Sequence, residues 1–252
     1  MNAIQQKLLD QIKKIAVYLF IALEFTIYAY FCFRDIAYND GCENVKYLSI
    51  CLCALMQILL FKKRKMQNLL LILAMALTLI ADVYLLLFET NERNNSIGIA
   101  FFVTVQLVYA IWLTINFYKS AHLSVIKKKR KIAFAVINAL RIALVVLSVP
   151  IVNNIDGALS STLAIVCFIM LLFNVACAFM QNKSSSNLLF AIGITLFALC
   201  DFSVGMSNVG TTLLNISFQA RSVFNFLMWF FYLPSQVLIT LSTYDKWSII
   251  DL

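Results

Sequence analysis

Long apolar runs alternate with short polar segments along the whole chain. Eight of these runs are near the length of about 20 residues that an α-helix needs to cross the hydrocarbon core of a membrane. A helix also satisfies its own backbone hydrogen bonds in lipid, so we predict helices rather than a sheet. The predicted spans cover residues 15–33, 47–61, 67–88, 97–118, 132–152, 158–180, 187–206 and 218–242.

The composition also indicates an integral membrane protein. Hydrophobic residues make up 62% of the 252 residues and charged residues 13%, whereas a soluble chain is typically about half apolar and a quarter charged. The net charge of +8 could suggest nucleic acid, but the basic residues lie in short runs between apolar segments. That placement is typical of cytoplasmic membrane flanks, so we expect contacts with membrane lipid and no nucleic-acid partner.

The basic residues also predict how the chain is oriented. If the N-terminus is cytoplasmic, the inner segments hold fifteen of the twenty Lys and Arg residues. The outer loops then hold three, namely Arg34, Lys46 and Arg93. This bias follows the positive-inside rule and places both termini in the cytoplasm. The first run lacks a small-residue cleavage site, and we expect it to be an uncleaved helix.

Two apolar segments share one design, which suggests an internal repeat. Asn68 to Asp82 and Asn187 to Asp201 each begin with asparagine, continue with apolar residues and end with aspartate. Both ends of the two segments are 119 residues apart. We therefore predict a single eight-helix membrane domain made of two parallel four-helix repeats, with halves of about residues 1–126 and 127–252.

The two aspartates are the main candidates for chemistry. Each lies about fifteen residues into its span, roughly 22 Å from the cytoplasmic side at 1.5 Å per residue. An aspartate facing lipid at that depth costs several kcal/mol, so Asp82 and Asp201 should face the bundle interior or a wet cavity. Two such carboxyl groups can divide the roles of acid and base. A simpler alternative is that each aspartate only pairs with Arg141 or Arg221.

Further polar side chains recur at helical spacing. One face of the last span carries five of them, at intervals of 4, 4, 3 and 4 residues: Arg221, Asn225, Trp229, Tyr232 and Gln236. The fourth span offers Gln106 and Tyr109. These residues either line a site or serve as hydrogen-bonding contacts between helices, which are common in membrane proteins.

Other polar features suggest structural roles. Glu24 and Arg141 lie near the middle of the first helix of each half, and we favour a buried ion pair between them over a catalytic role for Glu24. The seven cysteines show no metal-binding spacing and are expected to act mostly as small buried hydrophobes. The single His122 excludes a histidine-based metal cluster, and no nucleotide-binding or serine-hydrolase motif is present. We expect no metal and no cofactor.

Four short stretches carry a resemblance to a known family. They are Ile80–Leu87 around Asp82, Leu199–Ser203 around Asp201, Tyr232–Ile239 in the last span, and Gln106–Tyr109 in the fourth. Together with the topology, they resemble the YhhN family of eight-helix membrane proteins, which includes the lysoplasmalogenases. The chain departs from the family pattern at three positions: Ala81 replaces a glycine, Cys200 a serine and Gln106 a histidine.

The resemblance implies hydrolysis of the vinyl ether bond of lysoplasmalogens, or of a related ether lysolipid. Asp82 and Asp201 would then be the catalytic acid and base, because a vinyl ether is cleaved by protonation at carbon followed by attack of water. Arg221 would hold the phosphate of the lysophospholipid. The remaining substrate-binding candidates are Gln106, Tyr109, Asn225, Tyr232 and Gln236.

A second class of function uses the same aspartates. In a proton-coupled transporter or a lipid-binding protein, they would relay protons between the two halves. Transporters often have helices broken by Gly or Pro in both halves, whereas here Pro234 is the only proline in the middle of a span. We therefore favour the hydrolase. The residue usage leads us to expect a bacterial plasma membrane.

Overall fold

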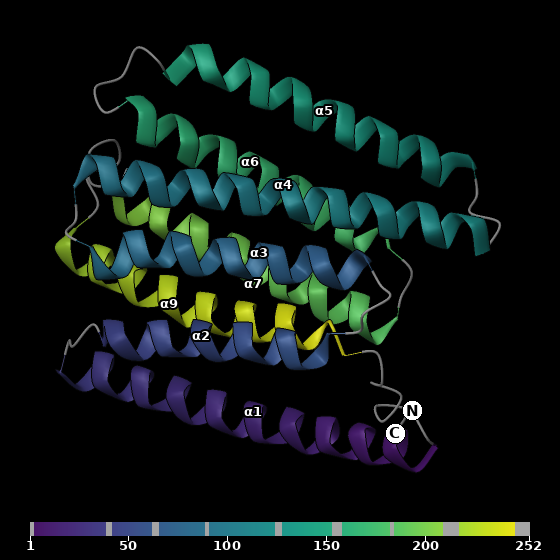
Figure 1. Cartoon of the computed structure of the whole chain (residues 1–252). Coiled ribbons are helices and arrows are strands. Elements are labelled where there is room, and N and C mark those ends of the chain that lie inside the picture. Colours follow the sequence, from purple (N-terminus) through teal and green to yellow (C-terminus); the bar gives the residue numbers. More distant parts are fainter. Residues whose placement is uncertain are drawn as a thin grey trace.

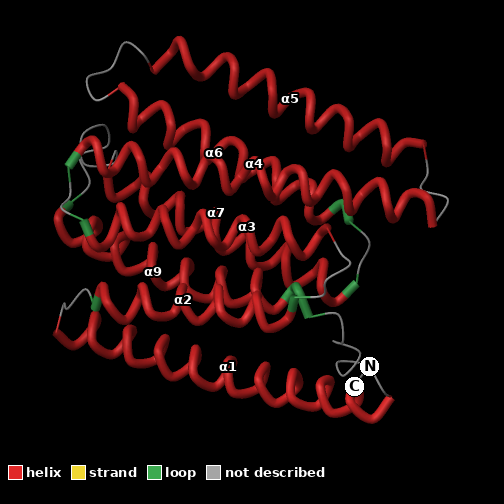
Figure 2. Tube along the Cα trace, viewed as in Figure 1, coloured by secondary structure: helices red, strands yellow, loops and turns green. Residues whose placement is uncertain are grey.

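The computed structural model describes residues 3–38, 42–61, 66–88, 91–123, 128–152, 158–181, 184–208 and 217–244. Within these ranges the protein is all-α, and no strand occurs (Figure 2). The helices are α1 (Ala3–Tyr38), α2 (Glu43–Leu60), α3 (Met66–Asp82) with its π-helical continuation η1 (Val83–Leu87), α4 (Glu92–Leu123), α5 (Lys128–Val152), α6 (Ala158–Phe179), α7 (Ser185–Asn208) and α9 (Phe218–Leu241).

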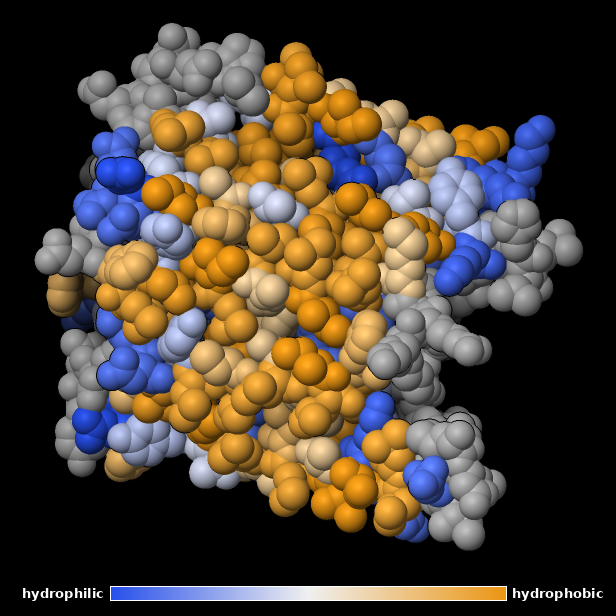
Figure 3. Space-filling model, in the orientation of Figure 1, coloured by the Kyte–Doolittle hydropathy of each residue, from blue (hydrophilic) through white to orange (hydrophobic). Residues whose placement is uncertain are grey.

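Eight helices of the described part are long and apolar enough to cross a membrane. They coincide with the eight predicted spans, so the prediction of an all-α integral membrane protein is confirmed. Large apolar side chains cover the outside of the bundle, and Figure 3 shows them as a broad band with polar residues gathered towards the two ends. Such a surface suits lipid rather than water.

The helices pack in an order that is the same in the two halves. Along the first half, α1 packs on α2, α2 on α3 and α3 on α4; along the second, α5 packs on α6, α6 on α7 and α7 on α9. The halves meet where α4 packs on α6 and where α1 and α2 pack on α9. The parallel repeat stays a prediction, to which this matching order of neighbours adds support.

The ends of the bundle agree with an even number of crossings. The N-terminal end of α1 and the C-terminal end of α9 lie at the same end of the molecule in Figure 1. Which side of the membrane that end faces stays a prediction from the basic residues.

The predicted ion pair between Glu24 and Arg141 is wrong. Their helices, α1 and α5, lie at opposite edges of the bundle (Figure 1), so the two side chains cannot meet. Glu24 is buried and accepts hydrogen bonds from the hydroxyl of Ser49 at 2.6 Å and the thiol of Cys53 at 3.8 Å, both on α2. Arg141 instead donates to Asn138 and Asn174. Glu24 and Arg141 therefore each bond to polar side chains of their own half.

Two glycines allow the central helices to approach closely. A Cβ added to Gly98 of α4 would lie 2.7 Å from Leu85 and 3.2 Å from the carbonyl oxygen of Ala81. A Cβ added to Gly193 of α7 would lie 2.9 Å from Ile239 and 3.0 Å from the carbonyl oxygen of Ser235, both on α9. Small residues serve this purpose in membrane bundles, and here they bring α4 to the end of α3, and α7 to α9.

The cysteines form no disulfide in the described part of the chain. Cys53, Cys167, Cys177 and Cys200 are buried, whereas Cys32, Cys42 and Cys51 are half-buried. The expected role as buried small hydrophobes therefore holds for four of the seven.

Candidate functional site

Asp82 is the last residue of α3 and lies inside the bundle with only 2% of its surface exposed. The hydroxyl of Tyr232, on α9, donates a hydrogen bond to its Oδ2 at 2.7 Å. A carboxyl group buried in apolar surroundings needs such a donor, because its ordinary partners in water are gone. The contact ties together two residues that are 150 positions apart in the chain.

Aromatic rings fix the position of Tyr232. Its ring centroid lies 6.3 Å from that of Phe102 on α4, 5.6 Å from that of Phe197 on α7 and 5.5 Å from that of Trp229 on α9. All three contacts are close to edge-to-face, the geometry that aromatic pairs prefer. The Tyr232 hydroxyl is thereby held on Asp82 by three different helices.

Asp201 reaches the same region from α7. It follows Phe197 by four residues, so the two side chains share one face of that helix. Asp201 is half-buried, and the thiol of Cys167 on α6 lies 4.0 Å from its Oδ2. Asp201 therefore contacts α6, one helical turn along α7 from Phe197, which packs on Tyr232.

The helical path changes directly after Asp82. Residues Val83–Leu87 form a π-helical turn, which widens the helix by one residue per turn. Such turns are frequent at functional sites. The apolar periodicity of the third span gave no sign of it, because every residue of the turn is apolar or aromatic.

Gln106 lies on α4 with no exposed surface and takes part in a hydrogen-bond chain that crosses three helices. Arg141 on α5 donates to Oδ1 of Asn174 on α6 at 2.8 Å. Asn174 in turn donates from Nδ2 to Oε1 of Gln106 at 3.0 Å and to its backbone carbonyl at 2.9 Å. Arg141 also donates to Asn138 one turn earlier on α5.

This chain of bonds has a direction. A guanidinium group only donates, so Asn174 must turn its carbonyl oxygen to Arg141 and its amide nitrogen to Gln106. Gln106 must then turn its own oxygen to Asn174, which leaves its Nε2 as a buried donor with no hydrogen-bond partner. Arg141, at the edge of the bundle, thus fixes the orientation of the Gln106 amide through Asn174, with its N–H group free to donate.

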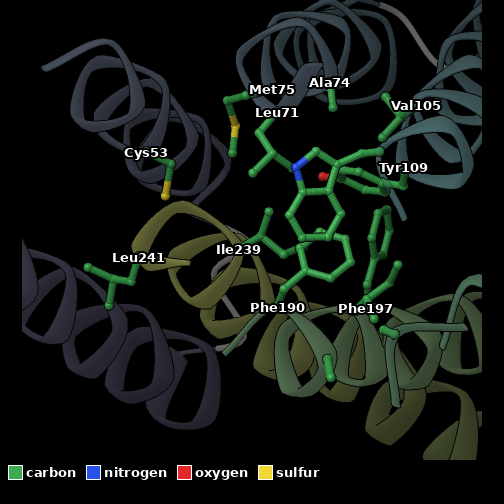
Figure 4. Close-up of a cluster of buried hydrophobic side chains, with 14 of the residues drawn as sticks. Cys53, Leu71, Ala74, Met75, Val105, Tyr109, Phe190, Phe197, Ile239 and Leu241 are labelled. Atoms are coloured by element: carbon green, nitrogen blue, oxygen red, sulfur yellow. The ribbon is translucent and has the colours of Figure 1, made fainter. Parts of the chain in front are cut away.

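Tyr109 offers a second buried polar group on the same helix. Its side chain is fully buried, its ring packs edge-on against Phe190 at 5.4 Å, and its hydroxyl has no hydrogen-bond partner. Figure 4 shows the side chain reaching from α4 into the centre of the apolar cluster, close to Leu71 and Phe190. A buried hydroxyl without a partner costs about 1–3 kcal/mol, so groups of this kind mark places where water or a ligand can bind.

The polar face of α9 runs from the surface to the core. Arg221 and Asn225 are exposed, Trp229 is half-buried, and Tyr232 and Gln236 are buried. Asn225 accepts a hydrogen bond from Ser207 of α7, so it lies at the α7–α9 contact. Gln236 donates to Ser235 at 3.4 Å, and its Oε1 has no hydrogen-bond partner. The geometry brings Tyr232 to Asp82 but leaves Arg221 near the start of the helix.

Lys46 was missed as a site residue because the sequence placed it in an outer loop. The structure has it in the first turn of α2 with 4% of its surface exposed. Its Nζ lies 4.3 Å from the ring centroid of Trp229 and 5.2 Å from that of Phe31. The signal was present in the sequence, because Lys46 precedes the buried residues Ser49, Ile50 and Cys53 by three, four and seven positions.

Metal-binding side chains do not cluster in the part of the chain that the structure describes. No three His, Cys, Asp or Glu residues lie there in a group that could hold a metal ion. The chemistry that the described residues can perform is proton transfer by carboxyl groups, together with hydrogen bonding by Tyr, Gln and Asn.

Comparison with known proteins gives one match. The family model for the YhhN family matches residues 44–243, which is most of the chain and includes both aspartates. None of the curated proteins and none of the solved structures that were compared with the chain matches it.

Proposed function

Since the chain belongs to the YhhN family, we propose that it is a membrane-embedded hydrolase that cleaves the vinyl ether bond of lysoplasmalogens. The observation that carries the proposal is the buried contact between Asp82 and Tyr232, which packs on Phe197, four residues before Asp201 on α7. Two carboxyl groups within a bundle that can lie in the membrane supply what this reaction needs, and the reaction requires neither a metal nor a nucleophilic serine.

The proposed reaction uses the two carboxyl groups in turn. One donates a proton to the alkenyl carbon that is not bonded to oxygen, and a cation forms that is shared by the other carbon and the ether oxygen. The second carboxyl group takes a proton from water as the water oxygen bonds to that other carbon. The first carboxyl group, now ionised, takes the hydroxyl proton of the resulting hemiacetal, and the second gives its proton to the glycerol oxygen as the C–O bond breaks. The products are a fatty aldehyde and a glycerophospho-headgroup, and both carboxyl groups return to their starting states.

The surrounding residues support these steps. Tyr232 holds Asp82 in place, and the unpartnered groups of Gln106 and Gln236 are suited to orient water or the glycerol hydroxyl. The buried hydroxyl of Tyr109 adds a further contact for the polar part of the substrate. The aromatic rings around Tyr232 exclude bulk water, and their electron-rich faces suit a transient cation.

The substrate is an amphiphile, so its chain can lie between helices while its polar part reaches the aspartates. Asp201 is half-buried, which leaves it open to a molecule that arrives from the side. We propose that Asn225, which is exposed at the α7–α9 contact, binds the polar headgroup.

The proposal is tested with purified protein in lipid or detergent that keeps it folded. Incubation with a lysoplasmalogen in heavy water should release an aldehyde that carries deuterium on the carbon next to the carbonyl, because that carbon receives the proton. The matched lysolipid with an ester in place of the vinyl ether should release no fatty acid. The proposal is wrong if the folded protein releases no aldehyde above the level of a heat-inactivated control.

A further inference from the structure

A buried lysine lies against Trp229, the residue that packs on Tyr232. Lys46 enters the bundle at the start of α2, and its ammonium group lies over the rings of Trp229 and Phe31. Aromatic rings attract an ammonium ion through their negative faces, and this attraction grows when the ion is removed from water.

The same aromatic residue connects Lys46 to the site. Trp229 packs at 5.5 Å between ring centroids against Tyr232, whose hydroxyl donates to Asp82. One indole ring therefore separates the ammonium group of Lys46 from the residue that holds Asp82. The groups come from α2, α3 and α9, and α2 packs on both of the other two.

The arginine predicted from the sequence is less well placed. Arg221 is exposed and precedes Tyr232 by eleven residues of α9, which is about 16 Å along the helix axis. A lysophospholipid carries its phosphate and its vinyl ether on one glycerol unit. The cation that binds the phosphate must therefore lie towards the Asp82 end of the site, and the ammonium group of Lys46 lies over Trp229, which packs on Tyr232.

From this geometry we infer that Lys46 is the residue that binds the phosphate of the substrate headgroup, in the role that the sequence suggested for Arg221. The inference rests on the proposed function for the identity of the ligand. A lysine recognises phosphate as a point charge, and a position with little water strengthens that attraction. Trp229 then aligns the lysine with the Asp82 end of the site, so that one lysolipid can contact both.

The test compares two substrates and two positions. Lys46→Met removes the charge and leaves an apolar side chain that suits a buried position, whereas Lys46→Arg keeps the charge. With a lysoplasmalogen, Lys46→Met should raise KM by about tenfold or more, the loss expected for one charge-assisted hydrogen bond. With the matching 1-alkenylglycerol, which lacks the phosphate, KM should stay within about twofold. Lys46→Arg should keep most of the preference for phosphate.

Arg221→Met is the matched control and should leave KM for both substrates unchanged. The inference is overturned if Lys46→Met weakens both substrates equally, or if Arg221→Met produces the larger and phosphate-specific effect. A thermal unfolding curve for each variant shows that it is folded before its KM is compared.

Binding without turnover separates this inference from the proposed reaction. The probe is a lysophospholipid with a saturated alkyl ether, which cannot undergo vinyl ether hydrolysis, compared with the alkylglycerol that lacks the phosphate. If wild-type protein releases no aldehyde but binds the alkyl lysophospholipid in a manner that depends on Lys46, the reaction is wrong and the anion site stands. If aldehyde is released but binding of the probe is the same in Lys46→Met, the anion site is wrong and the reaction stands.

Discussion

At the scale of the residue, the proposed site depends on the hydroxyl group of Tyr232. The hydroxyl of Tyr232 is the hydrogen-bond donor that the described structure gives to the buried carboxyl group of Asp82. Three rings restrict where that hydroxyl can go, so Asp82 is held in one orientation without a charged partner. The alternative that the aspartates only pair with Arg141 or Arg221 finds no support, because Arg141 bonds to two asparagines and Arg221 is exposed.

Removing that hydroxyl while keeping the ring should weaken catalysis. Tyr232→Phe leaves the aromatic contacts in place but deprives Asp82 of its donor, and we expect aldehyde release to fall by about tenfold to a hundredfold. Initial rates in detergent measure the effect. Tyr118→Phe, at an exposed tyrosine of α4, is the control and should change nothing. Equal rates for Tyr232→Phe and wild type would show that this hydrogen bond does not matter for the reaction.

At the scale of the element, hydrogen bonds between helices orient Gln106. Arg141 of the peripheral helix α5 donates to Asn174 of α6. Asn174 therefore donates from its amide nitrogen to Gln106 of α4. The family pattern has a histidine where this chain has Gln106. An amide whose orientation is fixed by Asn174 can present an N–H donor at that position, as a histidine ring can.

The direction of that chain can be reversed with one atom. Asn174→Asp still accepts from Arg141 but can no longer donate to Gln106, whose Nε2 then turns to the new carboxylate and is no longer free to bind substrate. We expect aldehyde release to fall by about tenfold while the protein stays folded. Asn138→Asp also places a carboxylate beside Arg141 but does not touch Gln106, and it should retain wild-type activity. If the two variants behave alike, the orientation of Gln106 is irrelevant.

The close contact between α7 and α9 depends on the absence of a side chain at Gly193. Gly193→Ala would put a Cβ within 3.1 Å of three atoms of α9, and we expect a loss of about 1–3 kcal/mol in the free energy of unfolding. Thermal unfolding in detergent should show a lower midpoint. Gly205→Ala, on the same helix with nothing within 4 Å, should leave the midpoint unchanged or raise it slightly. A midpoint for Gly193→Ala at or above that of Gly205→Ala would contradict the packing argument.

The sequence predicted the helices better than it predicted which side chains contact one another. Apolar run length sufficed for the eight spans, and the Asn-to-Asp segments indicated Asp82 and Asp201. Helical spacing placed Tyr232 on a polar face but could not reveal that it meets Asp82. The pairing of Glu24 with Arg141 failed because it depends on the order of helices around the bundle, which periodicity does not contain. The sequence did not indicate Lys46 as a site residue, because the predicted second span begins at residue 47.

At the scale of the whole molecule, the fold holds one polar centre inside an apolar bundle. The glycine of the seventh span, which a transporter could use as a break, here allows α7 to pack on α9. Here α3 packs on α4 and α7 on α9, and side-chain contacts of Asp82 and Phe102 with Tyr232 join the two pairs, which suits a fixed site better than alternating access.

The orientation of this bundle in the membrane follows from its basic residues. We expect both termini in the cytoplasm, because the inner segments hold fifteen of the twenty Lys and Arg residues. In a bacterial host, a green fluorescent protein fused to the C-terminus should fluoresce, and alkaline phosphatase fused there should be inactive. An active phosphatase fusion would reverse the predicted orientation.

The most direct test of the central claim is the rate of aldehyde release from a lysoplasmalogen by the variants Asp82→Asn and Asp201→Asn. Each substitution keeps the size of the side chain and removes its ability to exchange a proton. If the two carboxyl groups are the acid and the base, each variant should lose about a hundredfold or more of the wild-type rate while unfolding at a similar temperature. Wild-type rates in either folded variant would contradict the two-aspartate mechanism.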